Sequence, residues 1–360
     1  MRKTTIRCAL RRASLAVLML AVACAAQAQC KYKRLGAIPA EWVGSRLMID
    51  GSVNNQPVRM MVDTGSVWTI LSSGLARSMN LTLESANGEL AGFGGKSEIS
   101  LARLEELSIG RFQWHRTRAV VAWDAAKGFD DVIVGGNVLL QNDVEIDGKQ
   151  IALFSPSGCD DTPLAYWADD VPWVPTEAVT DEDLRTVITV QVNGQPVRAL
   201  VDTGAPRTML DASVARQLGF DPDDERARVG ESGGFGVHTA ILTSATFDTV
   251  AIGPELIRHP RIVVARLWQG IQDDYHRTGT RRYVDEQPKM ILGADFVRSH
   301  HLLFATSQRR LYFSYLGGDV FKAPKPPAAE PAAASGSAPA RGARGRAPAR
   351  VFEPVGQSVP

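Results

Sequence analysis

The sequence has few of the side chains that hold metals or carry thiol chemistry. Its 360 residues include four cysteines and six histidines, and no two cysteines form a C-x-x-C pair. H-E-x-x-H is also missing, and the adjacent His300 and His301 have no acidic partner at ligand spacing. We therefore expect no metal and no cofactor, and we place the histidine pair at the surface or at a strand edge.

The sequence also lacks an excess of charge of either sign. Charged residues make up 22% of the chain, and the formal net charge is +1. Residues 29–322 hold 30 of the 40 basic and 37 of the 39 acidic residues, so this part is mildly acidic and argues against a nucleic-acid surface. With 44% hydrophobic residues the chain can bury a substantial core, and its length suggests two or three domains.

The longest apolar run extends only from Ala13 to Ala26, which is shorter than the roughly 20 residues that span a bilayer. Five Lys or Arg precede it, and Ala26-Gln27-Ala28 fits a small-x-small cleavage site. This pattern predicts a signal peptide over residues 1–28, export to the periplasm or the medium, and no integral membrane segment after its removal. A lipoprotein anchored at Cys24 is the alternative, although Ala21 stands where such motifs prefer Leu.

Cleavage after Ala28 leaves two cysteines, Cys30 and Cys159, in a chain that enters an oxidising compartment. A disulfide between them would tie the new N-terminus to the middle of the chain. An unpaired buried thiol at Cys159 is equally compatible, because sequence does not report distance.

The C-terminal residues 323–360 have almost no apolar side chains to bury. They consist largely of Pro, Ala, Gly and Arg, a composition that predicts a disordered tail. The scattered arginines could touch anionic surfaces, but a solvated tail is what we expect.

A repeat organises the middle of the chain. "NNQPVRMMVDTG" (residues 54–65) and "NGQPVRALVDTG" (193–204) are identical at nine of twelve positions. An apolar segment precedes each copy, and Asn-Asn or Asn-Gly before Gln-Pro is typical of a hairpin turn. Each unit therefore predicts strand, turn and strand, followed by Asp-Thr-Gly.

Similar segments follow each copy. A short helical pattern comes first, then a Gly-rich hairpin and alternating strands, and then an apolar-apolar-Gly box, "VIVGGNVLL" (132–140) or "MILGADFVR" (290–298). Short, Gly-punctuated strands favour an all-β fold over βαβ units. We expect two similar β lobes at residues 34–155 and 180–316, related by a pseudo-two-fold axis and joined by a linker at 156–179.

Such an axis would bring Asp63 and Asp202 together. Two carboxylates about 3 Å apart share a proton, so one can act as a base while the other acts as an acid. That pair suits peptide hydrolysis by an activated water, with neither a covalent intermediate nor a metal. In the supporting turns, Gly65 and Gly204 would let the backbone approach closely. Thr64 and Thr203 would hydrogen-bond across the axis. A single Asp after a strand would more simply be a turn residue or a helix cap.

"VDTGSVWTIL" with "IVGGNVLL", and "VDTGAPRTML" with "ILGADF", resemble the paired signatures of retroviral-type (retropepsin-like) aspartic proteases. The layout, with two lobes in one chain, is similar to that of pepsin-like enzymes. The resemblance implies an acid protease fold, a catalytic pair at Asp63 and Asp202, and flaps over the substrate at the Gly-rich hairpins near Phe93, Gly94 and Phe235. A packed core Phe is the alternative for Phe93. The residue after Asp-Thr-Gly is Ser66 in the first copy and Ala205 in the second, so hydrogen bonding to the two carboxylates could be unequal.

These residues predict an exported aspartic endopeptidase that acts on proteins or peptides as a monomer with an intramolecular pair of carboxylates. One alternative is a peptide-binding module on the same scaffold with slow or lost hydrolysis. A binding protein, however, has no need to bury two like charges together. Pairing of each lobe with another chain is a further alternative.

Overall fold

The computed structural model describes residues 30–93, 95–123, 132–160, 162–180, 183–233, 238–268 and 287–325, all of which lie within one compact unit. Gly94, Phe235, the predicted signal peptide with Cys24, and residues 326–360 of the predicted tail lie outside the described residues. Within the described part, no helix is long and apolar enough to cross a membrane.

The first half is built from strands and two short helices. It contains β1 (Lys31–Val43), β2 (Arg46–Val53), β3 (Gln56–Val62), β4 (Ile70–Ser72), α2 (Ser73–Ser78), β5 (Leu83–Gly92), β6 (Gly95–Ile109), β7 (Phe112–Ala122), β8 (Val132–Val134), α3 (Gly136–Leu139), β9 (Asp143–Ile146) and β10 (Gln150–Ser157).

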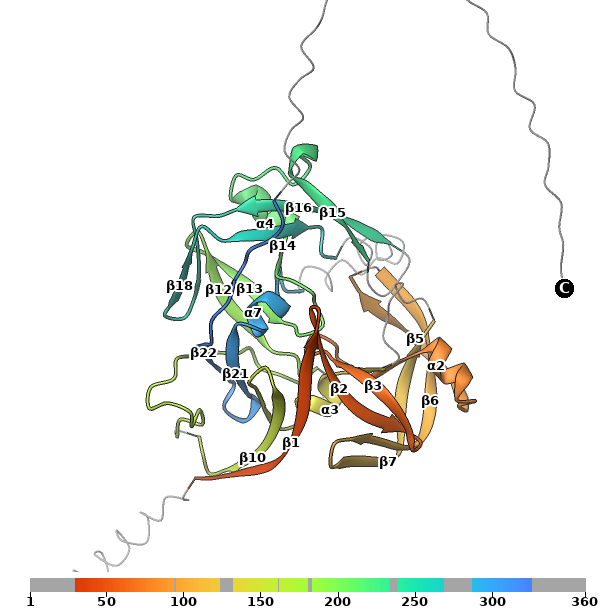
Figure 1. Cartoon of the computed structure of the whole chain (residues 1–360). Coiled ribbons are helices and arrows are strands. Elements are labelled where there is room, and N and C mark those ends of the chain that lie inside the picture. The colour runs from red at the N-terminus through yellow and green to blue at the C-terminus, as the bar shows by residue number, and fades with distance from the viewer. Residues whose placement is uncertain are drawn as a thin grey trace, which may run out of the picture. The chain divides into compact units, whose positions relative to one another are not determined.

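The second half repeats this order with small changes. It contains β11 (Trp173–Pro175), β12 (Val187–Val192), β13 (Gln195–Val201), β14 (Met209–Asp211), α4 (Ala212–Gln217), β15 (Arg228–Gly233), β16 (Thr239–Thr246), β17 (Thr249–Ile252), β18 (Glu255–Arg258), β19 (Arg261–Ala265), β20 (Met290–Leu292), α7 (Ala294–Val297), β21 (His300–Ala305) and β22 (Arg310–Tyr315). Short 3-10 helices lie at Glu225–Ala227 and Thr306–Gln308. The described chain is thus mostly β, which confirms the predicted all-β class (Figure 1).

Both repeat copies form the predicted hairpins. The turn residues Asn54 and Asn55 have φ angles of 49° and 65°, and Asn193 and Gly194 have φ angles of 49° and 79°. This left-handed backbone is what a tight hairpin turn requires, and Asn and Gly adopt it most readily. The turns fix the register of β2 with β3 and of β12 with β13.

The two halves also share a pairing pattern around the Asp-Thr-Gly strands. β3 runs parallel to β8, and β4 pairs with β8 in the antiparallel direction. β13 and β14 pair with β20 in the same two ways. The apolar-apolar-Gly box is therefore a strand inserted between the Asp-Thr-Gly strand and the next one, in each half.

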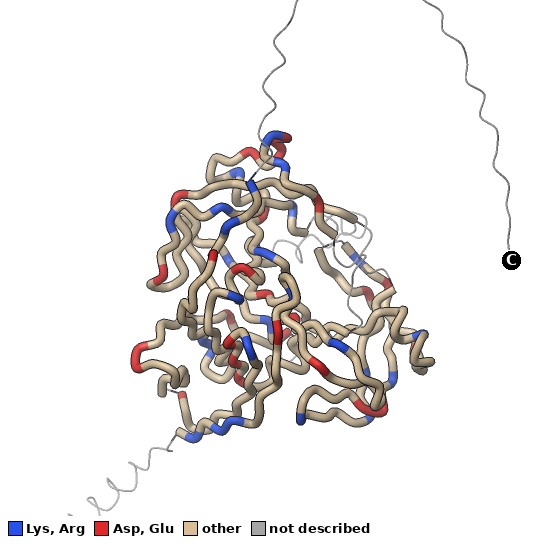
Figure 2. The backbone as a smooth tube through the Cα atoms, viewed as in Figure 1, with Lys and Arg blue, Asp and Glu red and all other residues tan. Residues whose placement is uncertain are grey.

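One sheet contains strands from both halves. Among the described residues, its strand order is β11-β22-β21-β9-β10-β1-β2-β3-β8-β4-β7-β6-β5. The second sheet has the order β15-β16-β19-β14-β20-β13-β12-β17-β18. β9 of the first half pairs with β21 of the second. Along the backbone, acidic and basic residues are interspersed in both sheets (Figure 2).

Three observations concern the ends of the predicted lobes and linker. β1 begins at Lys31, and its first residues pair with β10. The segment predicted as a linker, residues 156–179, contains β11, which pairs with β22. After Leu316, the predicted end of the second lobe, Phe321 and Ala323 are buried, and the Ala323 amide donates to the Arg261 carbonyl over 2.8 Å.

The adjacent histidines, which we expected at the surface or at a strand edge, lie instead in β21, a strand with neighbours on both sides. His300 is fully buried in β21, where its Nε2 lies 3.0 Å from a Glu255 carboxylate oxygen. His301 points to the other side of the strand, stacks on Trp167 and lies 2.6 Å from a carboxylate oxygen of the buried Glu145. Sequence spacing could not reveal these acids, because both come from distant strands.

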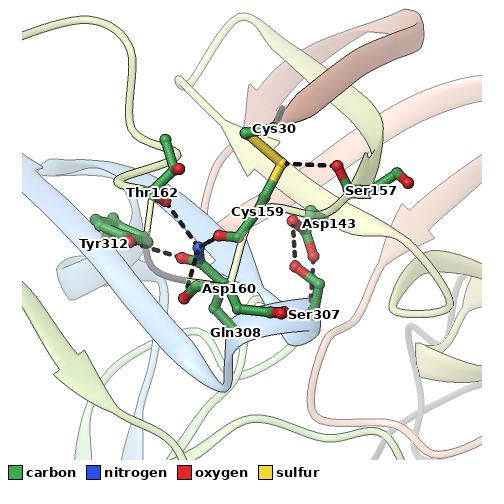
Figure 3. Close-up of a disulfide and its surroundings, with 9 residues drawn as sticks. All are labelled: Cys30, Asp143, Ser157, Cys159, Asp160, Thr162, Ser307, Gln308 and Tyr312. Carbon is green, nitrogen blue, oxygen red and sulfur yellow. Dashed lines mark hydrogen bonds between the residues drawn. A yellow bond between two sulfur atoms is a disulfide. The ribbon is translucent and has the colours of Figure 1, made fainter. Parts of the chain in front are cut away.

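Cys30 and Cys159 are joined by a disulfide, with 4.5 Å between their Cα atoms (Figure 3). The Gln308 side chain donates to the carbonyls of Cys159 and Thr162, so the segment after β10 is also held by the second half. The start of β1 is thereby fastened to the sheet that both halves share.

Candidate active site

The two Asp-Thr-Gly turns begin where their strands end. The Asp63 amide donates to the Val134 carbonyl over 3.0 Å, and the Asp202 amide donates to the Leu292 carbonyl over 2.9 Å. Each aspartate is thus the last residue held by the box strand beside it. The apolar strand fixes where the backbone stops, and the polar side chain stands at its end.

Each carboxylate accepts two backbone hydrogen bonds from its own turn. Asp63 Oδ1 accepts from the amides of Gly65 and Ser66 at 2.9 and 2.8 Å. Asp202 Oδ1 accepts from the amides of Gly204 and Ala205 at 2.8 and 3.2 Å. The Ser66 hydroxyl donates to the Trp68 carbonyl and not to the Asp63 carboxylate.

Four buried hydrogen bonds join the two turns. The Thr64 amide donates to Thr203 Oγ1 over 3.0 Å, and the Thr203 amide donates to Thr64 Oγ1 over 3.1 Å. The Thr64 hydroxyl donates to the Val201 carbonyl, and the Thr203 hydroxyl donates to the Val62 carbonyl, at 2.8 and 2.7 Å. Both hydroxyls donate and accept, so this exchange holds the two turns in one fixed arrangement.

Each turn glycine packs directly against the aspartate of the other half. A Cβ added to Gly65 would lie 2.3 Å from Asp202 Cγ, and one added to Gly204 would lie 2.3 Å from Asp63 Cγ. Such distances leave no room for any side chain at either position. Glycine at both turns is therefore what lets the two carboxyl groups approach.

The two carboxyl groups lie close enough for each to influence the pKa of the other. Burial raises the pKa of Asp63 well above its usual range, and the nearby Asp202 charge raises it further. Burial also raises the pKa of Asp202, while hydrogen bonds from Asp63 and the Gly204 amide oppose that rise. Both residues are only partly covered, so one side of the pair remains open to water.

Sequence reasoning missed a second pair of residues that support the turns. Asn137 Oδ1 accepts from the amide and hydroxyl of Thr69 at 2.7 and 3.0 Å, and Asp295 Oδ1 accepts the same two bonds from Thr208 at 2.7 Å each. The threonines lie six residues after the aspartates, at matching repeat positions. That match, together with a polar residue two positions after the box glycine, was the available signal.

Phe93 lies at the tip of the β5–β6 hairpin and is partly buried. It packs against an apolar cluster of the second half that includes Ala205, Met209 and Ile291. The hairpin of one half thus contacts the half that carries Asp202. The other predicted flap residues, Gly94 and Phe235, lie outside the described residues.

No group of three or more His, Cys, Asp or Glu side chains within the described ranges is arranged to hold a metal ion. The two carboxyl groups at the paired turns can exchange protons with a water molecule.

Fold and site together define the class of protein, since a mostly β chain in which two Asp-Thr-Gly turns bring two carboxyl groups together has the construction of an aspartic protease. Two family models match the sequence. The model described as "gag-polyprotein putative aspartyl protease" matches residues 49–141, and the model described as "Aspartyl protease" matches residues 188–296. The chain belongs to the retropepsin-like family of aspartic proteases.

Solved structures show more distant similarity. The aspartic proteinase from Irpex lacteus is 12% identical with a TM-score of 0.47, and the match covers 78% of this chain and 97% of that one. A retropepsin-like aspartic protease from Rickettsia conorii is 20% identical with a TM-score of 0.28, over 36% of this chain and 96% of that one. No curated protein matches the sequence.

Proposed function

We propose that this protein is an exported aspartic endopeptidase that hydrolyses peptide bonds with a water molecule held between Asp63 and Asp202. The observation that carries the proposal is the placement of the two carboxyl groups, each of which lies against the turn glycine of the other half. A pair of like charges is costly to bury, and catalysis gives a reason to keep it.

The two carboxyl groups have separate roles in the proposed reaction. Burial raises the pKa of both, so the pair can hold one proton, and either carboxyl group can carry it. The ionised carboxylate takes a proton from the attacking water, and the protonated one hydrogen-bonds the carbonyl oxygen as negative charge develops there. Transfer of a proton to the amide nitrogen then releases the amine and leaves a carboxylic acid, which balances the addition of one water.

Export and a monomeric site complete the proposal. The N-terminal sequence pattern and the disulfide between Cys30 and Cys159 both suit an oxidising compartment, either the periplasm or the medium. The bonds between Thr64 and Thr203 connect turns of the same chain, which supports a site formed within one molecule.

The test is digestion of casein by the chain without residues 1–28, from about pH 3 to 7. Asp63→Asn, Asp202→Asn and a transition-state-mimicking aspartic protease inhibitor are compared with the parent. We expect cleavage by the parent and none in the other three reactions. A folded parent that cleaves nothing across this range would refute the proposal.

A further inference from the structure

A cavity of about 510 Å³ lies where the two halves meet beside the Asp202 turn. The first half contributes the turn between β1 and β2, and the second contributes the Asp202 loop, α7 and the segment after β22 (Figure 1). Its lining includes Gly44, Ser45, Pro206, Ala294, Arg298 and Asp319. Both halves therefore form its wall.

The cavity is joined to the catalytic pair by a short chain of backbone bonds. The Ala294 amide donates to the Ala205 carbonyl over 2.9 Å, and the Ala205 amide donates to the Asp202 carboxylate over 3.2 Å. Pro206 follows directly and lines the cavity. A ligand there contacts the same loop that holds Asp202.

Arg298 supplies the unmatched charge of this cavity. Its exposed guanidinium has one hydrogen bond, a long one of 3.4 Å to the Gly44 carbonyl, and it has no carboxylate partner within the described part of the chain. Of the two acids in the wall, Asp319 is paired with Lys322, and Asp295 is engaged by Thr208. Burial also raises the Asp295 pKa.

We propose that Arg298 and this cavity form a binding subsite for an acidic side chain, Asp or Glu, of the peptide substrate. The inference rests on the proposed protease function and adds a charge preference to it. A guanidinium binds a carboxylate through charge-assisted hydrogen bonds, and the Ser45 hydroxyl in the same wall is a further donor. The bond from Arg298 to Gly44 keeps the guanidinium at the boundary between the halves.

The experiment starts from casein-derived peptides in which each position around the cleaved bond carries Glu, Gln or Lys in turn. Cleavage is measured at low salt with the parent, Arg298→Ala, Arg298→Glu and a control, Arg258→Ala, which removes an exposed arginine from β18. At one position, the parent should cleave the Glu peptide about tenfold faster in kcat/KM than the Gln peptide. The preference should disappear in Arg298→Ala, reverse toward Lys in Arg298→Glu, and persist in the control.

Two results would overturn the subsite. A Glu preference that is absent from the parent, or retained in Arg298→Ala, shows that Arg298 does not bind the substrate. An equal loss for all peptides in Arg298→Ala shows that its bond to Gly44 only fastens the halves together.

Binding of the Glu and Gln peptides to the Asp63→Asn variant, measured by fluorescence anisotropy, separates this inference from the proposed function. Arg298-dependent binding with an inactive parent supports the subsite and refutes the protease. Cleavage by the parent without the charge preference supports the protease and refutes the subsite. If the peptides are neither bound nor cleaved, both proposals are refuted.

Discussion

Adding one methyl group at Gly65 should disable the site without unfolding the protein. A Cβ there would lie 2.3 Å from Asp202 Cγ, whereas unbonded carbon atoms pack at about 3.5 to 4.0 Å. Relief requires a movement on the order of 1 Å by the Asp202 carboxyl or by its turn. A displacement of that size at a catalytic group lowers the rate about a hundredfold.

The expected result for Gly65→Ala is therefore a loss of about a hundredfold or more in kcat/KM. Overpacking should also reduce the free energy of unfolding by about 1 to 3 kcal/mol. Gly204→Ala should behave alike, because its Cβ would lie 2.3 Å from Asp63 Cγ. The assays are peptide cleavage and urea unfolding followed by circular dichroism.

Gly74→Ala is the matched control. Gly74 is exposed in α2, and a Cβ there would meet only the Ser72 hydroxyl, at 3.8 Å. This variant should retain full activity and gain a little stability from the better helix propensity of alanine. If folded Gly65→Ala kept kcat/KM within about threefold of the parent, Gly65 could not lie against the Asp202 carboxyl group as described.

Three further changes test other parts of the structure. Replacing Cys30 and Cys159 by serine should lower the free energy of unfolding by about 2 to 5 kcal/mol, and an unchanged Tm would argue against the bond. Asp295→Asn should keep activity, while Asp295→Ala should lower kcat/KM because the turn loses its acceptor; equal rates in both would refute this role. Burial raises the Asp295 pKa, so the native state binds that proton more tightly than the unfolded state does. Stability therefore falls as the pH rises from 3.8 toward the native pKa. In measurements of Tm against pH, Asp295→Asn should flatten that fall. Thr64→Val leaves the Thr203 amide unpaired and should cost about 1 to 3 kcal/mol in urea unfolding, which Thr64→Ser should restore.

The features that sequence could predict are local or duplicated. Asn-Asn and Asn-Gly determined both hairpin turns, because few residues adopt left-handed backbone. The nine-of-twelve repeat predicted that two Asp-Thr-Gly turns belong together, since a copied motif implies copied surroundings.

The remainder depends on contacts between distant segments. β11 lies in a Pro-rich and Asp-rich stretch that resembles a linker, and only its pairing with β22 makes it a strand. His300 has a polar side chain, which by itself suggests an exposed position. It is buried because Glu255 and the Phe296 carbonyl satisfy both of its ring nitrogens. Phe93 contacts the opposite half, which no pattern within its own hairpin could indicate.

The central claim is that one chain carries a complete pair of catalytic carboxylates, and a mixing experiment tests it most directly. The Asp63→Asn and Asp202→Asn variants are assayed alone, mixed in equal amounts, and beside the parent on casein. Our account predicts an active parent whose specific activity does not change with protein concentration, and no activity in the mixture. Activity restored by mixing would contradict it, because the two aspartates would then meet between chains.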